Sequence, residues 1–157
     1  MRARAGNRLI VPSTRAHVAL SSVPCWPQVR FLSKLGVDGV VALNTQKDYD
    51  NFELPSADRA LLEHYTQKYG GGLSGPPILA RSTKQAAAAQ SAVDELGLAG
   101  AFTVIHVGGV QSAEDVQSSR ETGAELRQWY TGLMHGLSQP EPMTLYARLT
   151  APAPGSK

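Results

Sequence analysis

Short apolar runs alternate along this chain with segments whose apolar positions recur at helical spacing. Four runs have the length and composition of strands: residues 16–21, 39–43, 102–107 and 126–130. The second, GVVAL, is apolar throughout, as in a parallel strand buried on both faces. Strands that alternate with helices favour parallel βαβ units. The pattern predicts an α/β fold with about four parallel strands, forming a partial barrel or a small open sheet.

The helices expected between these strands are placed by signals at their ends. Ser56, Ser82 and Ser112 stand where helix N-caps are expected, and Asp115 completes a variant of the capping box with Ser112. Glycines follow the predicted helices as stop signals. The expected helices span residues 27–35, 56–69, 82–96 and 112–122, and a final helix or loop is expected at residues 131–137.

Charge and composition divide the chain into three parts. Residues 1–15 form a basic arm, residues 16–137 carry the periodic pattern, and residues 138–157 are rich in proline and alanine. Residues 1–37 contain six basic residues and no acidic residue, a composition that is typical of a mitochondrial targeting segment. The alternative is the basic arm of a cytosolic protein.

Several classes of function receive little support from composition. The net charge of +2 is low for a nucleic-acid-binding protein, and no apolar run approaches the roughly 20 residues of a membrane-spanning helix. Cys25 is the single cysteine and is expected to be a packed small side chain. The four histidines are scattered, so no metal site is predicted.

Glycine-bearing or polar turns follow three of the predicted strands, at Asn44–Thr45, Gly108–Gly109 and Tyr130–Gly132. Ligands of parallel α/β folds bind beyond the carboxyl ends of the strands, and turns that lead into helices suit phosphate groups. Glycines that merely form turns are the alternative, since a lone Gly-Gly pair is a weak motif.

The ordered series LGVDGVVALNT, GGLSGPP, VIHVGGVQSAEDV and TGAELRQWYTGL resembles the last third of the membrane-associated type of dihydroorotate dehydrogenase. The resemblance covers about residues 32–137 and implies part of a (β/α)₈ barrel that holds FMN at the strand carboxyl ends. It also implies a mitochondrial location in eukaryotes and electron transfer to quinone. By resemblance, the flavin and substrate pocket would involve Asn44, Thr45, Gly71, Gly72, Gly108, Gly109, Tyr130 and Thr131.

The chain also departs from the pattern of this family. The family places a lysine on the strand that corresponds to residues 16–21, whereas the first lysine here is Lys34. Leu43 replaces a threonine, and His106 replaces a glycine where an imidazole is expected to crowd the phosphate. Glu125 and Arg127 interrupt the last strand and are expected to face solvent or a partner. Residues 1–15 supply none of the family's upstream flavin contacts or its catalytic base.

Three hypotheses follow. The first is a non-catalytic accessory subunit, derived from a dihydroorotate dehydrogenase, in a larger mitochondrial protein complex. It predicts no catalytic residue and no bound cofactor, and other protein subunits as partners. The second is one half of a split FMN-dependent enzyme, and the third is a non-catalytic module that binds FMN or another phosphate ligand. Losses at the site favour the first over the other two.

Overall fold

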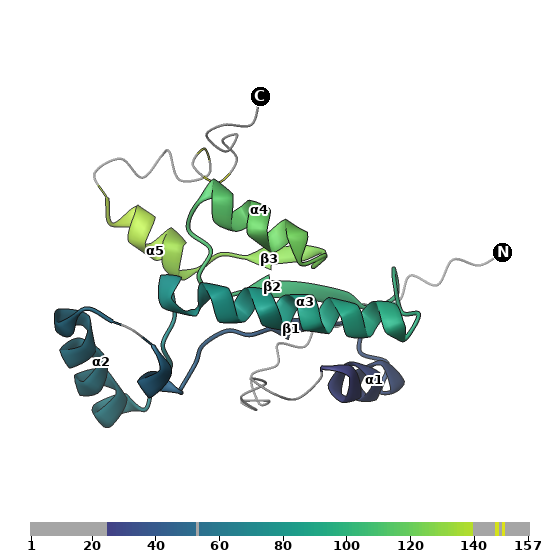
Figure 1. Cartoon of the computed structure of the whole chain (residues 1–157), viewed down its shortest axis with the longest axis horizontal. Coiled ribbons are helices and arrows are strands. Elements are labelled where there is room, and N and C mark those ends of the chain that lie inside the picture. Colours follow the sequence, from purple (N-terminus) through teal and green to yellow (C-terminus); the bar gives the residue numbers. More distant parts are fainter. Residues whose placement is uncertain (1–24, 53, 140–146, 148, 150–157) are drawn as a thin grey trace.

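The computed structural model of the chain describes residues 25–52 and 54–139, together with Ala147 and Leu149. The predicted basic arm, the predicted strand at residues 16–21 and nearly all of the predicted tail lie outside these residues. Figure 1 shows the described elements, coloured along the sequence. They are α1 (Trp26–Lys34), β1 (Gly39–Ala42), the 3₁₀ helix η1 (Tyr49–Asn51), α2 (Ser56–Tyr69), the 3₁₀ helix η2 (Pro76–Ile78), α3 (Leu79–Glu95), β2 (Thr103–Val107), α4 (Ala113–Glu121), β3 (Leu126–Gln128) and α5 (Thr131–Leu137).

The three described strands form one parallel sheet in the order β1-β2-β3. Val41 pairs with Ile105, and Ile105 pairs with Leu126. Helices separate consecutive strands, as in the predicted βαβ units, so the predicted α/β class is confirmed. Because all the strands run in one direction, their carboxyl ends meet at one edge of the sheet.

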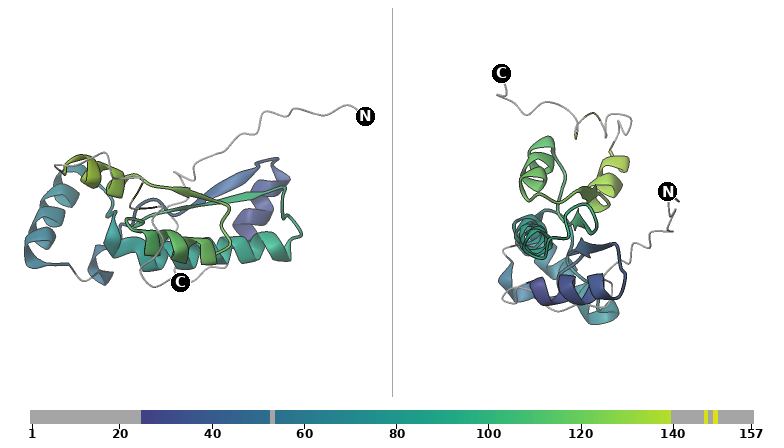
Figure 2. Two further views of the ribbon diagram at one scale, coloured as in Figure 1. Left: turned by 90° about the horizontal axis from the view of Figure 1, so that it is seen from above. Right: turned by 90° about the vertical axis from the view of Figure 1, so that its right-hand side faces the viewer.

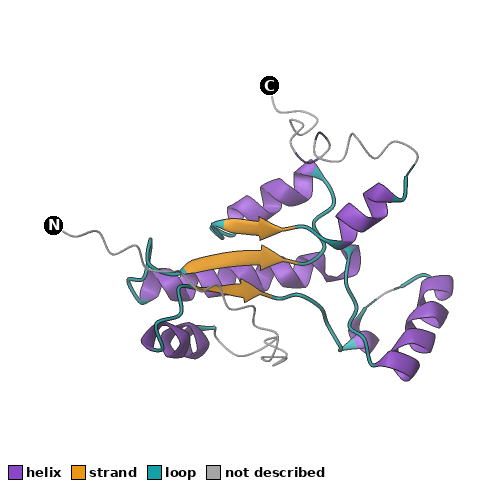
Figure 3. Ribbon diagram, turned by 180° about the vertical axis from the view of Figure 1, so that it is seen from behind, coloured by secondary structure: helices purple, strands orange, loops and turns teal. Residues whose placement is uncertain are grey.

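The helices that pack on this sheet lie on one of its faces. Figure 3 shows the opposite face, over which no described helix passes, and the left view of Figure 2 shows α3 and α4 together beneath the strands. Side chains alternate between the two faces along each strand. Val104 therefore joins the core under the helices, while its neighbour Ile105 points to the other face. This core also contains Val29 of α1 and Ala86, Ala89 and Val93 of α3.

Alanines make the central helix fit closely on the sheet. Ala86, Ala89 and Ala92 are at most 3% exposed, so α3 presents a flat, small-residue face to β1 and β2. The helix ends as predicted, because Gly97 has a φ of +65° that suits glycine. Its predicted start was wrong. The helix begins at Leu79, so Ser82 is a buried interior residue and no N-cap.

Two other predicted caps have opposite outcomes. Ser112 accepts a hydrogen bond from the Asp115 N–H, and Asp115 accepts one from the Ser112 N–H, which confirms the capping box. The prediction for Ser56 was wrong, because Ser56 is already the first helical residue and Pro55 precedes it without a side-chain cap. Pro55 itself is extended, with a φ of −52° and a ψ of 148°, and the helix begins directly after it.

Helix α2 projects from the body of the fold, at the lower left of Figure 1. None of its residues is buried, although its apolar residues recur at helical spacing as predicted. Leu61, Tyr65 and Tyr69 are each more than half exposed, and the two tyrosine rings stack with centroids 5.8 Å apart. Among the described helices, none is long and apolar enough to cross a membrane.

Candidate ligand-binding cleft

A cleft of about 380 Å³ lies at the carboxyl ends of the three strands. Each strand contributes the residues that follow it, and the loop before η2 closes one side. This is the edge where ligands of parallel α/β folds bind. The lining residues are Asn44, Thr45, Ser74, Gly75, Val107, Gly108, Gly109, Val110, Gln128, Trp129, Tyr130, Thr131 and Gly132.

The Gly108–Gly109 turn after β2 forms the floor of this cleft and packs tightly on the start of α3. Gly108 has a φ of +121° and Gly109 a φ of +86°, both favourable for glycine alone. A Cβ on Gly109 would lie 2.7 Å from the Cα of Leu79, closer than real atoms approach. The turn therefore requires both glycines for backbone reasons, whether or not a ligand binds.

The segment after β1 reaches the cleft through a short antiparallel bridge to the glycine-rich loop. The N–H of Gln46 donates to the Leu73 carbonyl at 2.9 Å, and the N–H of Leu73 donates back at 2.7 Å. This bridge places Asn44 and Thr45 opposite Ser74 and Gly75. The chain enters it through Leu43, whose φ of +63° is left-handed and unfavourable for a leucine.

Two of the predicted site residues, Gly71 and Gly72, do not line the cleft. Gly72 packs against the side chain of Thr45, where a Cβ would lie 2.6 Å from the Thr45 Cβ. The carbonyl of Gly71 accepts a hydrogen bond from the Tyr49 hydroxyl. Both glycines thus stand beside the bridge. The other six predicted residues are brought together in the lining.

The lining groups are almost all neutral. The Thr131 hydroxyl donates to the Ser74 hydroxyl at 3.1 Å, which joins α5 to the glycine-rich loop. Asn44, Gln128 and Tyr130 add further polar side chains, and no lysine, arginine, histidine, aspartate or glutamate is among the described residues that line the cleft. Such a lining can donate hydrogen bonds to phosphate oxygens but supplies no side-chain charge to neutralise them. Elsewhere in the described residues, no three histidine, cysteine, aspartate or glutamate side chains gather as a metal site.

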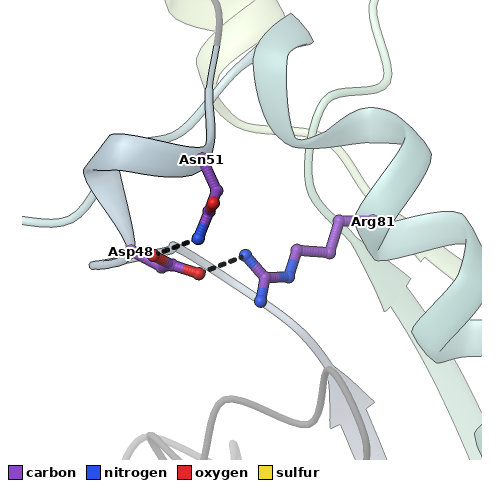
Figure 4. A network of polar contacts seen from close by, with 3 residues as sticks. All are labelled: Asp48, Asn51 and Arg81. Atoms are coloured by element: carbon purple, nitrogen blue, oxygen red, sulfur yellow. Dashed lines mark hydrogen bonds and ion pairs between the residues drawn. The ribbon is translucent and has the colours of Figure 1, made fainter.

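An ion pair holds the segment beside the cleft against α3 (Figure 4). Arg81 donates to the Asp48 carboxylate at 3.2 Å, and Asn51 donates to its other oxygen at 2.6 Å. These hydrogen bonds, Asn51 first, lower the pKa of Asp48 below its ordinary 3.8. The guanidinium also lies 5.9 Å from the centre of the Phe52 ring.

His106 does not crowd the cleft, so the prediction made for it was wrong. Its side chain points to the helix-covered face of β2 and is fully buried. There its Nδ1 lies 2.6 Å from the Ser119 hydroxyl and its Nε2 lies 2.9 Å from the Ser82 hydroxyl. Burial, and secondly the charge of Arg127, lowers the pKa of His106 below its ordinary 6.5. The alternation of side chains along a strand explains the error, because Val107, and not His106, faces the cleft.

The two charged residues of the last strand also have different environments. Glu125 is exposed, as predicted, and accepts a hydrogen bond from Thr103 at 2.8 Å. Arg127 instead lies half-buried beside His106, and its Nη2 donates to the Ala124 carbonyl at 3.1 Å. Burial, and secondly the charge of Arg120, lowers the pKa of Arg127. Arg127 is thus only partly exposed to solvent, and whether a partner contacts it stays a prediction.

Comparison with known proteins places the chain and its fold in a family. The model of the dihydroorotate dehydrogenase family matches residues 27–141, which is most of the chain. The chain belongs to the dihydroorotate dehydrogenase family. The resemblance of the ordered motifs is thereby confirmed, and the sheet is part of a barrel.

Individual relatives agree with this assignment. The chain is 44% identical over 101 residues to a dihydroorotate dehydrogenase (quinone) of Leptothrix cholodnii, covering 64% of this chain and 25% of that protein. It is 37% identical over 122 residues to the enzyme of the same name from Chromobacterium violaceum, covering 78% of this chain and 31% of that protein. The chain thus spans about a quarter to a third of the length of these relatives.

A solved structure shows the same architecture. The dihydroorotate dehydrogenase of Eimeria tenella, crystallised with ferulenol, superposes with a TM-score of 0.54 at 25% identity. The match covers 77% of this chain and 27% of that one.

Several lining residues were missed in the sequence. Ser74 lies inside a loop that was noted for its glycines, and its hydroxyl reaches Thr131, 57 positions away. Gln128 and Trp129 belong to a segment that was predicted as strand, but β3 ends at Gln128. The local pattern carries no signal for this end of the strand, so it did not indicate that Gln128 and Trp129 reach the cleft.

Proposed function

We propose that this chain is a non-catalytic structural subunit, derived from a dihydroorotate dehydrogenase, of a larger mitochondrial protein complex. The observation that carries the proposal is the chemistry of the cleft. Among the lining residues that the structure describes, Tyr130 alone has an ionisable side chain, and none of them offers a carboxylate, imidazole, thiol or amine to move a proton. The acid-free basic segment at residues 1–37 supports the mitochondrial location.

The sheet supports the role of protein partners. Its helix-free face carries the apolar row Val41, Ile105 and Leu126, of which Ile105 is buried, Val41 is half-buried and Leu126 is 47% exposed. An apolar side chain as exposed as Leu126, on an edge strand of the described sheet, favours contact with another protein surface. In a complete barrel this face would be the interior, so a structural subunit must have it covered in another way.

A native mass spectrum of the protein, purified from its source without denaturant, tests this function. We expect a stable complex with other proteins and no mass increment of FMN. A monomer without partners would contradict the structural role. A complex with one partner chain that carries FMN and oxidises dihydroorotate would replace it with the split-enzyme hypothesis.

One observation favours binding of a phosphate ligand as a second candidate function. Six residues assigned to the flavin pocket by resemblance come together in one cleft of suitable place and size. The hydroxyls of Thr45, Ser74 and Thr131, with the Gly108–Gly109 turn, would hold the phosphate of FMN. When bound, FMN supplies hydride and electron transfer. Titration of FMN with the purified chain, followed by flavin fluorescence, tests this candidate. A dissociation constant (Kd) below about 10 μM would support it.

A further inference from the structure

A continuous line of hydrogen bonds runs from α4 through β2 and α3 to the turn that floors the cleft. Ser119 lies 2.6 Å from Nδ1 of His106, and Nε2 of the same ring lies 2.9 Å from Ser82. The Ser82 hydroxyl in turn lies 2.6 Å from the Gly108 carbonyl oxygen and 2.8 Å from the Leu79 carbonyl oxygen. His106, Ser82 and Ser119 are all fully buried.

The hydrogen-bond partners of the His106 ring determine which neutral tautomer it adopts. The Ser82 hydroxyl has a single proton and two carbonyl acceptors, so it donates to a carbonyl and accepts from Nε2–H of His106. Nδ1 then carries the lone pair and accepts from the Ser119 hydroxyl. In this neutral form every donor of the line has an acceptor. A proton added to Nδ1 would make the ring the donor there, so the Ser119 hydroxyl would have to rotate and accept instead.

We propose that His106 is a positioning residue of the cleft: through Ser82 it holds the Gly108 carbonyl, and so keeps the glycine turn in the conformation that receives a phosphate monoester. This inference rests on the phosphate-binding role proposed for the cleft. Ser82 contacts the turn from behind, where a Cβ on Gly108 would meet the Ser82 Cβ at 3.1 Å. Protonation leaves the Nε2–H donor in place but adds a second positive charge beside Arg127, and the repulsion between the two charges loosens the position of the ring against Ser82. Ligand affinity therefore falls in acid.

The surroundings of the ring favour the neutral form. Arg127 of β3 is its neighbour in register and is the charged group that acts on it. Helix α3 presents Ser82 and helix α4 presents Ser119, while β1 places Ala42 alongside, and these three are uncharged. A second positive charge in this buried place would be repelled by the arginine.

Three variants of the full chain test the inference, with FMN as the probe and intrinsic flavin fluorescence as the signal. His106→Gln keeps an N–H that can reach Ser82 but does not titrate, whereas His106→Leu keeps neither donor nor acceptor. Ser119→Ala removes only the far end of the line and touches no cleft residue. We expect His106→Leu to weaken FMN binding about tenfold at pH 7.5, Ser119→Ala about threefold and His106→Gln less than threefold.

The pH profile separates positioning from simple packing. The FMN phosphate has its own second pKa of about 6. Wild type and His106→Gln therefore both lose affinity for FMN in acid for this shared reason. Between pH 7.5 and 5, wild type should lose more affinity for FMN than His106→Gln does. The difference measures the effect of protonating the His106 imidazole. Equal profiles for the two proteins, or unchanged affinity in His106→Leu, would overturn the inference.

A ligand-free measurement distinguishes failure of the relay from failure of the cleft as a binding site. The backbone ¹⁵N–¹H signals of Gly108 and Gly109 should shift with the titration of His106 in wild type and stay constant in His106→Gln. If these signals follow pH but FMN binds to no variant, the phosphate-binding role fails and the relay stands. If FMN binds and the signals do not follow pH, the relay is wrong.

Discussion

Nε2 of His106 lies 2.9 Å from the hydroxyl of Ser82, so an imidazole on the central strand is joined to the helix behind it. The ring is fully buried and its pKa is lowered, first by burial and then by Arg127. The folded chain therefore binds a proton at this site less readily than the unfolded chain, whose histidine has the ordinary pKa of 6.5.

The free energy of unfolding should consequently decrease as the pH is lowered. The contribution of His106 is fully present above pH 6.5 and is lost as the pH falls from there through the pKa of the folded state. Urea unfolding at pH 8, 7, 6 and 5 measures the free energy of unfolding. We expect a decline below pH 6.5 in wild type that is smaller in His106→Gln. Parallel curves for the two proteins would show that another group causes the decline.

Leu43 offers a stabilising substitution. Its φ of +63° is left-handed, which costs about 1 kcal/mol for a leucine and less for asparagine. Leu43→Asn should raise the free energy of unfolding by about 0.5 kcal/mol, after loss of some apolar contact. Leu35→Asn is the matched control, since Leu35 is 63% exposed with a φ of −80°, and should give no increase. An equal gain in both variants would contradict backbone strain as the cause.

The glycine turn should not tolerate a side chain. Gly109→Ala would place a Cβ 2.7 Å from the Cα of Leu79, so backbone must shift in addition to adopting an unfavourable φ. We expect a loss of about 3 kcal/mol in the free energy of unfolding, measured in urea. Gly36→Ala is the control, because Gly36 has a similar φ of +77° with no atom within 4 Å, and should cost about 1 kcal/mol. Similar losses of unfolding free energy in the two variants would mean that the backbone of the turn shifts enough to accommodate the added methyl group.

Arg81 should limit the motion of the segment beside the cleft. The guanidinium is 19% exposed and pairs with Asp48, whose carboxylate also holds Asn51. Arg81→Met should speed amide hydrogen exchange at residues 48–51 by about three- to tenfold and leave β2 unchanged. Lys84→Met changes an exposed charge on the same helix and should have no effect. Faster exchange in both variants would indicate a general loss of helix stability instead.

Helix α2 should contribute little to the stability of the chain. Leu61, Tyr65 and Tyr69 are 56%, 52% and 64% exposed. Replacing all three with serine should change the free energy of unfolding by less than about 0.5 kcal/mol per site. Val93→Ser, at a site that is fully buried in the core, should cost several times more in the same urea titration. A large loss in the triple variant would show that this stripe packs against other residues of the chain.

The sequence by itself determined the class of the fold and most of the elements. Apolar runs such as GVVAL specify strands because a parallel strand is covered on both sides, and this requirement acts locally. Gly97 and the Ser112–Asp115 pair mark helix ends through backbone hydrogen bonds that also span only a few residues. The order of the motifs was enough to identify the family, because each motif occupies its own place along the strands.

Tertiary structure decided the direction of side chains and the contents of the cleft. The face to which His106 points depends on the register of β2 in the sheet, and a shift by one residue would exchange the faces. Ser82 looked like a cap because nothing nearby in the sequence indicates the buried imidazole that it contacts, 24 positions away. Ser74 meets Thr131 across 57 positions. Such pairs form only when distant segments pack together, so local pattern carries no signal for them.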